Sequence, residues 1–109
     1  MNQRDIKSGR KIIINADDFG SCEGINAGII KAHTEGVLSS TTLMTNMPFA
    51  EKAVALTKSL PDLGVGIHLN LTDGRPLSKE FCVSRLTNTA GEFAFPVMKL
   101  CLMSFLSPS

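Results

Sequence analysis

The stretch that decides the fold is residues 12–20, Ile-Ile-Ile-Asn-Ala-Asp-Asp-Phe-Gly, in which a run of isoleucines leads into two adjacent carboxylates and a glycine. β-Branched side chains are stiff and favour strands, and an unbroken apolar run is typical of a strand buried on both faces of a parallel sheet. Ligands of such sheets bind at the carboxyl ends of the strands. We therefore expect a buried strand that ends at Asp17 and Asp18, beside a ligand site.

The acidic pair has two interpretations. Adjacent carboxylates repel each other unless a cation or a proton compensates, which favours a metal or catalytic role. Aspartates are also common at helix starts and turns, so Asp17 and Asp18 could simply cap the next helix and bend the loop. Successive strand residues point to opposite faces, so the two can have different roles at one site only if the strand has turned into a loop there. Gly20 favours such a turn.

The following residues alternate helical and strand patterns. Apolar residues recur at helical spacing from residue 25 until Gly36, and β-branched and apolar residues fill residues 37–44. A second helix is predicted from Pro48 to about Leu60, where Pro61 stops it, and a third strand over residues 65–71. This order predicts an α/β fold, with parallel strands alternating with helices.

The two histidines have different predicted roles. His68 interrupts the apolar third strand and, in an aligned parallel sheet, lies on the same rim as Asp17 and Asp18. Imidazole and carboxylate together make a partial shell for a divalent ion, although a lone strand histidine can also be a hydrogen-bonded core residue. His33 lies near the end of the first helix, where a polar or cationic tip is favourable, and we expect it to be structural.

The composition bounds the class of protein. The chain has 109 residues, 43% of them hydrophobic, and a formal net charge of +1, which predicts one soluble domain or part of one, with neither nucleic acid nor a membrane as partner. Residues 1–10 are polar throughout and lack the apolar stretch of a secretory signal, so we expect a disordered lead-in and a cytoplasmic protein. Cys22, Cys82 and Cys101 are odd in number and lack metal-type spacing, which favours reduced thiols.

Several segments of the sequence also resemble a known family, in the same order and spacing. They are NADDFG (15–20), GINAGI (24–29), SSTTLM (39–44), NMP (46–48), GVGIHLNLT (64–72) and GRPL (74–77). Together they resemble the YdjC-like carbohydrate deacetylases, which include the chitooligosaccharide deacetylases. The resemblance implies the N-terminal part of a (β/α)-barrel-like deacetylase fold, with residues 11–109 as a partial domain of that family.

The resemblance implies an activity as well: removal of an N-acetyl group from a small sugar, with one divalent metal ion. Position by position, Asp17 matches the family's general base, and Asp18 and His68 match two of its metal ligands. Amide hydrolysis needs an activated water and a stabilised carbonyl oxygen, and one ion can serve both needs. The ligand types favour zinc, cobalt or manganese, whereas the resemblance favours magnesium, so the choice between magnesium and zinc stays open.

The chain departs from the family in its length. The family's metal shell has a further histidine beyond residue 109, and a complete barrel needs about 200 residues or more. We therefore interpret the chain as truncated and expect little activity from it alone. The apolar residues 97–106 are too few to span a membrane and predict a helix that packs against parts outside this chain. An exposed sheet edge and this segment favour a homo-oligomer.

Two alternatives to an active deacetylase remain. One is an inactive fragment of the same family. The other is a magnesium-binding receiver-type signalling domain, which also has an acidic pair after its first strand. A receiver needs an aspartate at the end of its third strand and a lysine after its fifth, where this chain has His68 and Asn70 and only Lys99 in an apolar run. Asn46, Asn70 and Arg75 could contact a substrate or brace turns.

Overall fold

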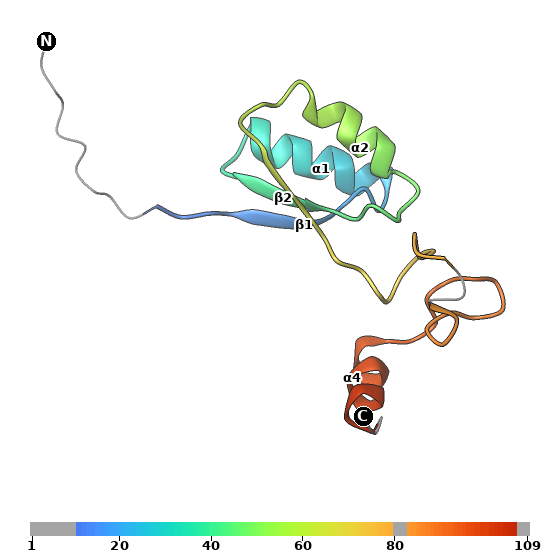
Figure 1. Cartoon of the computed structure of the whole chain (residues 1–109). Coiled ribbons are helices and arrows are strands. Elements are labelled where there is room, and N and C mark those ends of the chain that lie inside the picture. Colours follow the sequence, from blue (N-terminus) through green and yellow to red (C-terminus); the bar gives the residue numbers. More distant parts are fainter. Residues whose placement is uncertain (1–10, 80–82, 107–109) are drawn as a thin grey trace, which may run out of the picture.

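The structure of the chain is a computed structural model that describes residues 11–79 and 83–106. The predicted lead-in at residues 1–10 and Cys82 lie outside the described residues. Strands and helices alternate along the chain as predicted (Figure 1). The elements are β1 (Asn15–Phe19), α1 (Glu23–Thr34), β2 (Ser40–Leu43), α2 (Ala50–Thr57), β3 (Gly64–Ile67) and α4 (Val97–Leu106).

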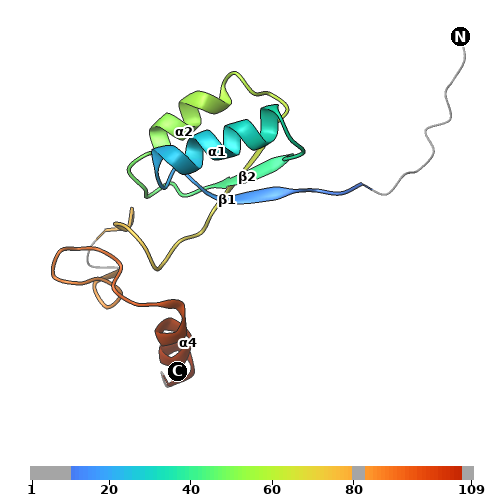
Figure 2. The same ribbon diagram turned by 180° about the vertical axis from the view of Figure 1, so that it is seen from behind.

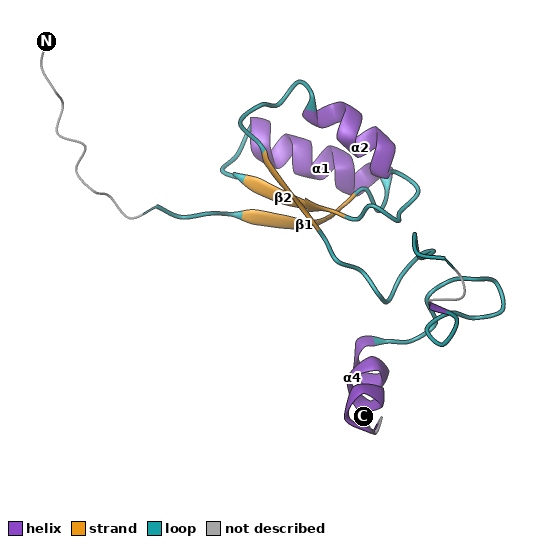
Figure 3. Cartoon of the chain, in the orientation of Figure 1, coloured by secondary structure: helices purple, strands orange, loops and turns teal. Residues whose placement is uncertain are grey.

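The three strands form one parallel sheet in the order β1-β2-β3. Both α1 and α2 lie on the same face of the sheet, which the two opposite views show (Figures 1 and 2). The opposite face carries no helix among the described residues (Figure 3). The α/β class with parallel strands is confirmed, and one face of the sheet stays open beside the candidate site.

The core lies between the sheet and the two helices. Its buried residues come from β1, α1, β2, α2 and the loop that precedes β2, and they are Phe19, Ile29, Leu38, Leu43, Ala50 and Ala53. Thr41 is also fully buried in β2, where its hydroxyl donates to the carbonyl of Ala16 at 2.8 Å. Burial of these apolar side chains is the main force that holds α1 and α2 against the sheet.

The prediction that the isoleucine run is buried is wrong. Ile12 is 81% exposed and Ile13 is 78% exposed, and β1 begins only at Asn15. In the described residues β1 is an edge strand, and no other strand or helix covers the residues that precede it. The backbone still follows β2, because the Ile14 carbonyl accepts hydrogen bonds from the amides of Ser39 and Ser40.

The other two strands are shorter than predicted. β2 begins at Ser40 rather than at residue 37, and Val37 is 76% exposed. β3 ends at Ile67, before His68, but the His68 amide still donates to the Leu43 carbonyl at 2.9 Å. This last bond places His68 directly at the carboxyl end of the sheet.

The helix predicted over residues 97–106 is present as α4. It stands apart from the sheet in both views, and several of its apolar side chains are exposed, among them Val97, Met98, Leu102 and Phe105 (Figures 1 and 2). Among the described helices, none has the length and apolarity that a membrane crossing requires.

A β-bulge in β1 places the two aspartates. Ala16 pairs with Thr41 and Phe19 pairs with Leu43, so Asp17 and Asp18 together stand opposite one residue of β2. Asp18 has a φ of 64°, a left-handed conformation that aspartate tolerates better than most side chains. An extra residue breaks the alternation of side chains between the two faces. Both carboxylates therefore lie within β1, and a bulge rather than a loop allows them different positions.

The buried Asn26 side chain fixes the end of β1. It is 2% exposed, accepts a hydrogen bond from the Gly20 amide at 2.7 Å and donates to the Phe49 carbonyl at 3.3 Å. The Phe49 amide in turn donates to the Gly20 carbonyl at 3.0 Å. Gly20 has a φ of 95°, and a Cβ there would lie 3.0 Å from the Ala50 Cα, so the close approach requires glycine. Asn26 thus joins the loop after β1 to the start of α2.

We expect Asn26→Ala to lower the free energy of unfolding by about 1–3 kcal/mol, because it leaves the buried Gly20 amide without a partner and removes one of the two hydrogen bonds to the Phe49 carbonyl. Urea unfolding followed by circular dichroism measures this. Lys31→Ala, on the exposed side of the same helix, should change the value by less than about 0.5 kcal/mol. An equal effect of both substitutions would contradict the role of Asn26.

We expect Asp18→Gly to be more stable than Asp18→Ala by about 1 kcal/mol, because alanine bears the steric cost of a positive φ and glycine does not. The same pair of substitutions at Asp17 should give the opposite order, because among the described non-glycine residues only Asp18 has a positive φ. Thermal unfolding of the four variants compares them, and the same order at both positions would argue against the bulge.

Candidate active site

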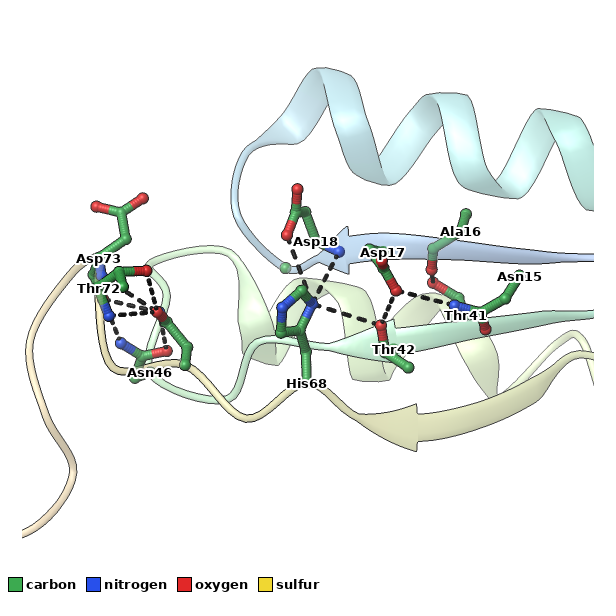
Figure 4. A network of polar contacts seen from close by, with 12 residues as sticks. Asn15, Ala16, Asp17, Asp18, Thr41, Thr42, Asn46, His68, Thr72 and Asp73 are labelled. Carbon is green, nitrogen blue, oxygen red and sulfur yellow. Dashed lines mark hydrogen bonds and ion pairs between the residues drawn. The ribbon is translucent and has the colours of Figure 1, made fainter. Parts of the chain in front are cut away.

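The structure brings Asp17, Asp18 and His68 together at the carboxyl end of the sheet (Figure 4). Asp17 and Asp18 come from the bulge in β1, and His68 follows β3 directly. The Asp18 Oδ1 and His68 Nδ1 atoms are 3.5 Å apart. Parallel alignment of β1 and β3 on either side of β2 therefore creates the predicted cluster.

Hydrogen bonds from two strands hold Asp17. Its Oδ1 accepts one from Asn15 Nδ2 at 2.9 Å and one from Thr42 Oγ1 at 2.8 Å. One oxygen of an ionised carboxylate can accept both hydrogen bonds, because an ionised carboxylate has acceptor sites and no donor. No described residue hydrogen-bonds to the other oxygen, Oδ2. Asp17 is thus oriented through one oxygen and can accept a proton on the other.

The ring nitrogen of His68 that faces Asp18 has no short hydrogen bond. Its Nδ1 accepts a long hydrogen bond from the Asp18 amide at 3.4 Å and lies 3.4 Å from Thr42 Oγ1 and 3.5 Å from Asp18 Oδ1. These distances exceed the usual 2.7–3.2 Å range. Two ligands at about 2.0–2.1 Å from a tetrahedral ion lie roughly 3.4 Å apart. The 3.5 Å separation of Asp18 Oδ1 and His68 Nδ1 is close to that spacing.

The described residues provide only part of a metal shell. They contain no group of three or more His, Cys, Asp or Glu side chains arranged around one position. Cys22, which is near the acidic pair in sequence, is exposed and free, as is Cys101. An ion held by Asp18 and His68 would need water or further ligands to complete its coordination.

The cluster borders an open pocket of about 600 Å³. The side chain of Asp18 is 53% exposed and that of His68 is 29% exposed, so both are accessible from this pocket. Its wall combines polar and apolar residues, among them Ser21, Leu69, Leu71, Thr72, Asp73 and Val97. The Ser21 hydroxyl is buried and has no hydrogen-bond partner among the described residues. A small molecule could reach the cluster through this pocket.

Asn46 and Asn70 brace the turn that forms one side of the pocket. Both donate from Nδ2 to the Asp73 carbonyl at 2.8 Å, and Asn70 also donates to Asn46 Oδ1 at 3.1 Å (Figure 4). Asn70 Oδ1 accepts from the amides of Thr72 and Asp73. Of the two roles that the sequence left open for these asparagines, the structure shows the bracing one.

His33 lies outside the candidate site, as expected. Its Nδ1 is 2.8 Å from the Leu38 carbonyl, so it connects the end of α1 to the segment before β2.

One carboxyl away from the site has a shifted pKa. Lys52 of α2 lowers the pKa of the exposed Glu23 carboxyl of α1, first through its hydrogen bond and second through its charge.

Sequence reasoning missed Thr42 and Asn15, the two residues that orient Asp17. Thr42 lies opposite the acidic pair only because of the register between β1 and β2, which the sequence alone does not reveal. Asn15 lies two residues before Asp17, and this spacing normally places side chains on one face of a strand. The sequence alone therefore contained a signal for Asn15 but none for the shared contact with Thr42.

Comparisons with known proteins identify the family of the chain. The YdjC-like protein family matches residues 11–105. A carbohydrate deacetylase of Vibrio cholerae serotype O1 (strain M66-2) is 54% identical over 83 residues, which are 76% of this chain and 32% of that protein. Carbohydrate deacetylase 2 of Listeria innocua serovar 6a is 56% identical over 86 residues, which are 79% of this chain and 34% of that protein.

A solved structure is similar as well. A crystal structure from Enterococcus faecalis V583, described as a candidate cellobiose-phosphate cleavage protein, superposes with a TM-score of 0.70 at 40% identity. The match covers 74% of this chain and 32% of that one. These matches argue against a receiver-type signalling domain. The chain belongs to the YdjC-like protein family and spans about a third of the length of the curated relatives that it matches.

Proposed function

We propose that this chain carries part of the active site of a metal-dependent carbohydrate deacetylase. The observation that supports this most is the Asp18–His68 pair, 3.5 Å apart and beside a separately oriented Asp17. The names of the relatives supply the substrate class, a carbohydrate, and the reaction class, deacetylation. The overall reaction combines an N-acetylated sugar with water and yields acetate and a free amine.

Asp18 and His68 would hold one divalent ion, zinc or magnesium. Such an ion, when bound, polarises an amide carbonyl and makes water more acidic. Asp18 suits this role because its carboxylate faces the ring nitrogen of His68. The bulge also separates it from Asp17, whose Oδ1 is already occupied by two donors.

Asp17 would act as the general base. Its Oδ2 takes a proton from the attacking water as the new carbon–oxygen bond forms, and the proton then passes to the nitrogen as the carbon–nitrogen bond breaks. Its Oδ1 keeps the hydrogen bonds from Asn15 and Thr42 throughout, which limits rotation of the carboxylate. The two adjacent aspartates thus have different roles, one as a base and one as a ligand.

The open pocket would receive the sugar. Its volume of about 600 Å³ lies within the range of small-molecule sites, roughly 300–1,000 Å³. Its apolar wall includes Leu69 and Leu71, which suit the carbon–hydrogen face of a sugar ring, and Thr72 and Asp73 offer polar groups for hydroxyls. A small N-acetylated sugar is therefore the partner that we propose.

We expect the chain to bind zinc, and magnesium or manganese more weakly, in a calorimetric titration. Asp18→Ala and His68→Ala should each weaken zinc binding by more than the roughly 10- to 100-fold that loss of an outer-shell partner costs, because each removes a direct ligand. Asp62→Ala and His33→Ala are matched controls away from the site and should leave the affinity unchanged. Equal affinity in all five proteins would rule out the proposed ligand pair.

We expect Asp17→Asn to lower deacetylation by roughly 10²–10⁴-fold, because it removes the proton acceptor. Release of acetate from N-acetylated chitooligosaccharides is measured on the protein produced from its complete reading frame, with Asp62→Asn as control. Zinc affinity should stay the same. Collapse of zinc binding would instead make Asp17 a ligand and reverse the two roles, and a wild-type protein without activity would favour the inactive-fragment interpretation.

A further inference from the structure

We propose that Thr42 is a positioning residue that sets the orientation of the Asp17 carboxylate. Its catalytic consequence rests on the proposed deacetylase function, but the positioning itself does not. Thr42 stands alone in β2 opposite the bulge, between Asp17 on one neighbouring strand and His68 at the end of the other (Figure 4). Its hydroxyl lies near the side chains of both.

The hydroxyl of Thr42 serves Asp17 in preference to His68. Its Oγ1 lies 2.8 Å from Asp17 Oδ1 and 3.4 Å from His68 Nδ1. A hydroxyl has one proton to donate, and a bond to a carboxylate is both shorter and stronger than one to a neutral acceptor. The proton therefore points to Asp17.

The methyl group and the hydroxyl of Thr42 lie toward different neighbouring strands. Thr42 pairs with Gly66 of β3, and a Cβ built on Gly66 would lie 3.6 Å from Thr42 Cγ2. The methyl group thus lies toward β3 while the hydroxyl lies toward β1. A β-branched side chain has few χ1 rotamers, so the hydroxyl has few alternative directions.

The remaining support of Asp17 is local. Asn15 donates to Asp17 from two residues earlier in the same strand, and Ser40 Oγ holds Asn15 Oδ1 at 2.8 Å. These contacts act at the start of β1, before the bulge. The Thr42 hydroxyl is therefore the contact that ties the Asp17 carboxylate to the central strand at the level of His68.

The test compares three variants, each of which loses one methyl or hydroxyl group relative to the wild type. Thr42→Val keeps the branched shape and loses the hydroxyl, Thr42→Ser keeps the hydroxyl, and Thr41→Val loses a hydroxyl from the adjacent residue, which bonds to a backbone carbonyl in the core. The first readout is the χ1 rotamer of Asp17, measured from its Hα–Hβ couplings by NMR without metal. We expect one rotamer in the wild type, Thr42→Ser and Thr41→Val, and averaged couplings in Thr42→Val.

The second readout separates positioning from folding and from metal binding. In the protein from the complete reading frame, Thr42→Val should lower kcat about 10- to 100-fold, as expected for loss of a hydrogen bond to a charged group, with KM and zinc affinity nearly unchanged. Thr42→Ser should restore most of kcat, and Thr41→Val should lower stability without this split between kcat and KM.

The outcomes distinguish this inference from the proposed function. Unchanged Asp17 couplings in Thr42→Val would overturn the positioning role, and an unchanged kcat in an active protein would overturn its catalytic consequence. A wild-type protein that releases no acetate would overturn the deacetylase proposal, and the couplings would then still decide whether Thr42 orients Asp17. Loss of zinc affinity in Thr42→Val would show that Thr42 acts on the Asp18–His68 pair instead, which would also overturn the inference.

Discussion

The pairing of two residues of β1 against one residue of β2 is the constraint on which the candidate site depends. In a regular strand, neighbouring side chains point to opposite faces, and one of the two aspartates would face the core beside Phe19. The bulge removes this conflict by placing Asp18 in a left-handed conformation. Phe19 then returns to the core, where it is fully buried. The chain thus uses one strained residue to combine a carboxylate pair with an intact core.

The sequence predicted the order of the elements but misjudged their environment. Proline and glycine positions and the spacing of apolar residues were sufficient for α1, β2, α2 and β3, because these signals are local. The isoleucine run was expected inside the sheet, yet Ile12 and Ile13 are exposed, because burial depends on which other segments cover a strand and not on its own composition. In the described residues, nothing covers that side of β1.

The candidate site was predictable in its membership and not in its geometry. Asp17, Asp18 and His68 could be placed on one rim because parallel strands end at the same edge of a sheet. The bulge could not be predicted, because side chains of a strand normally alternate between its two faces and nothing in the sequence indicates an additional residue in β1. Thr42 gained its place from that register alone. Long-range pairing therefore determines the contacts of Asp17, whereas local pattern determines only that an acidic pair is present.

The buried amide of Asn26 has a consequence for motion in this protein. Because it hydrogen-bonds both to Gly20 and to the carbonyl of Phe49, the segment after the bulge and the start of α2 cannot move apart without breaking buried bonds. The acidic pair is therefore anchored, through the segment that follows it, to the start of α2. Asp18 therefore forms a side of the pocket whose position follows that of α2.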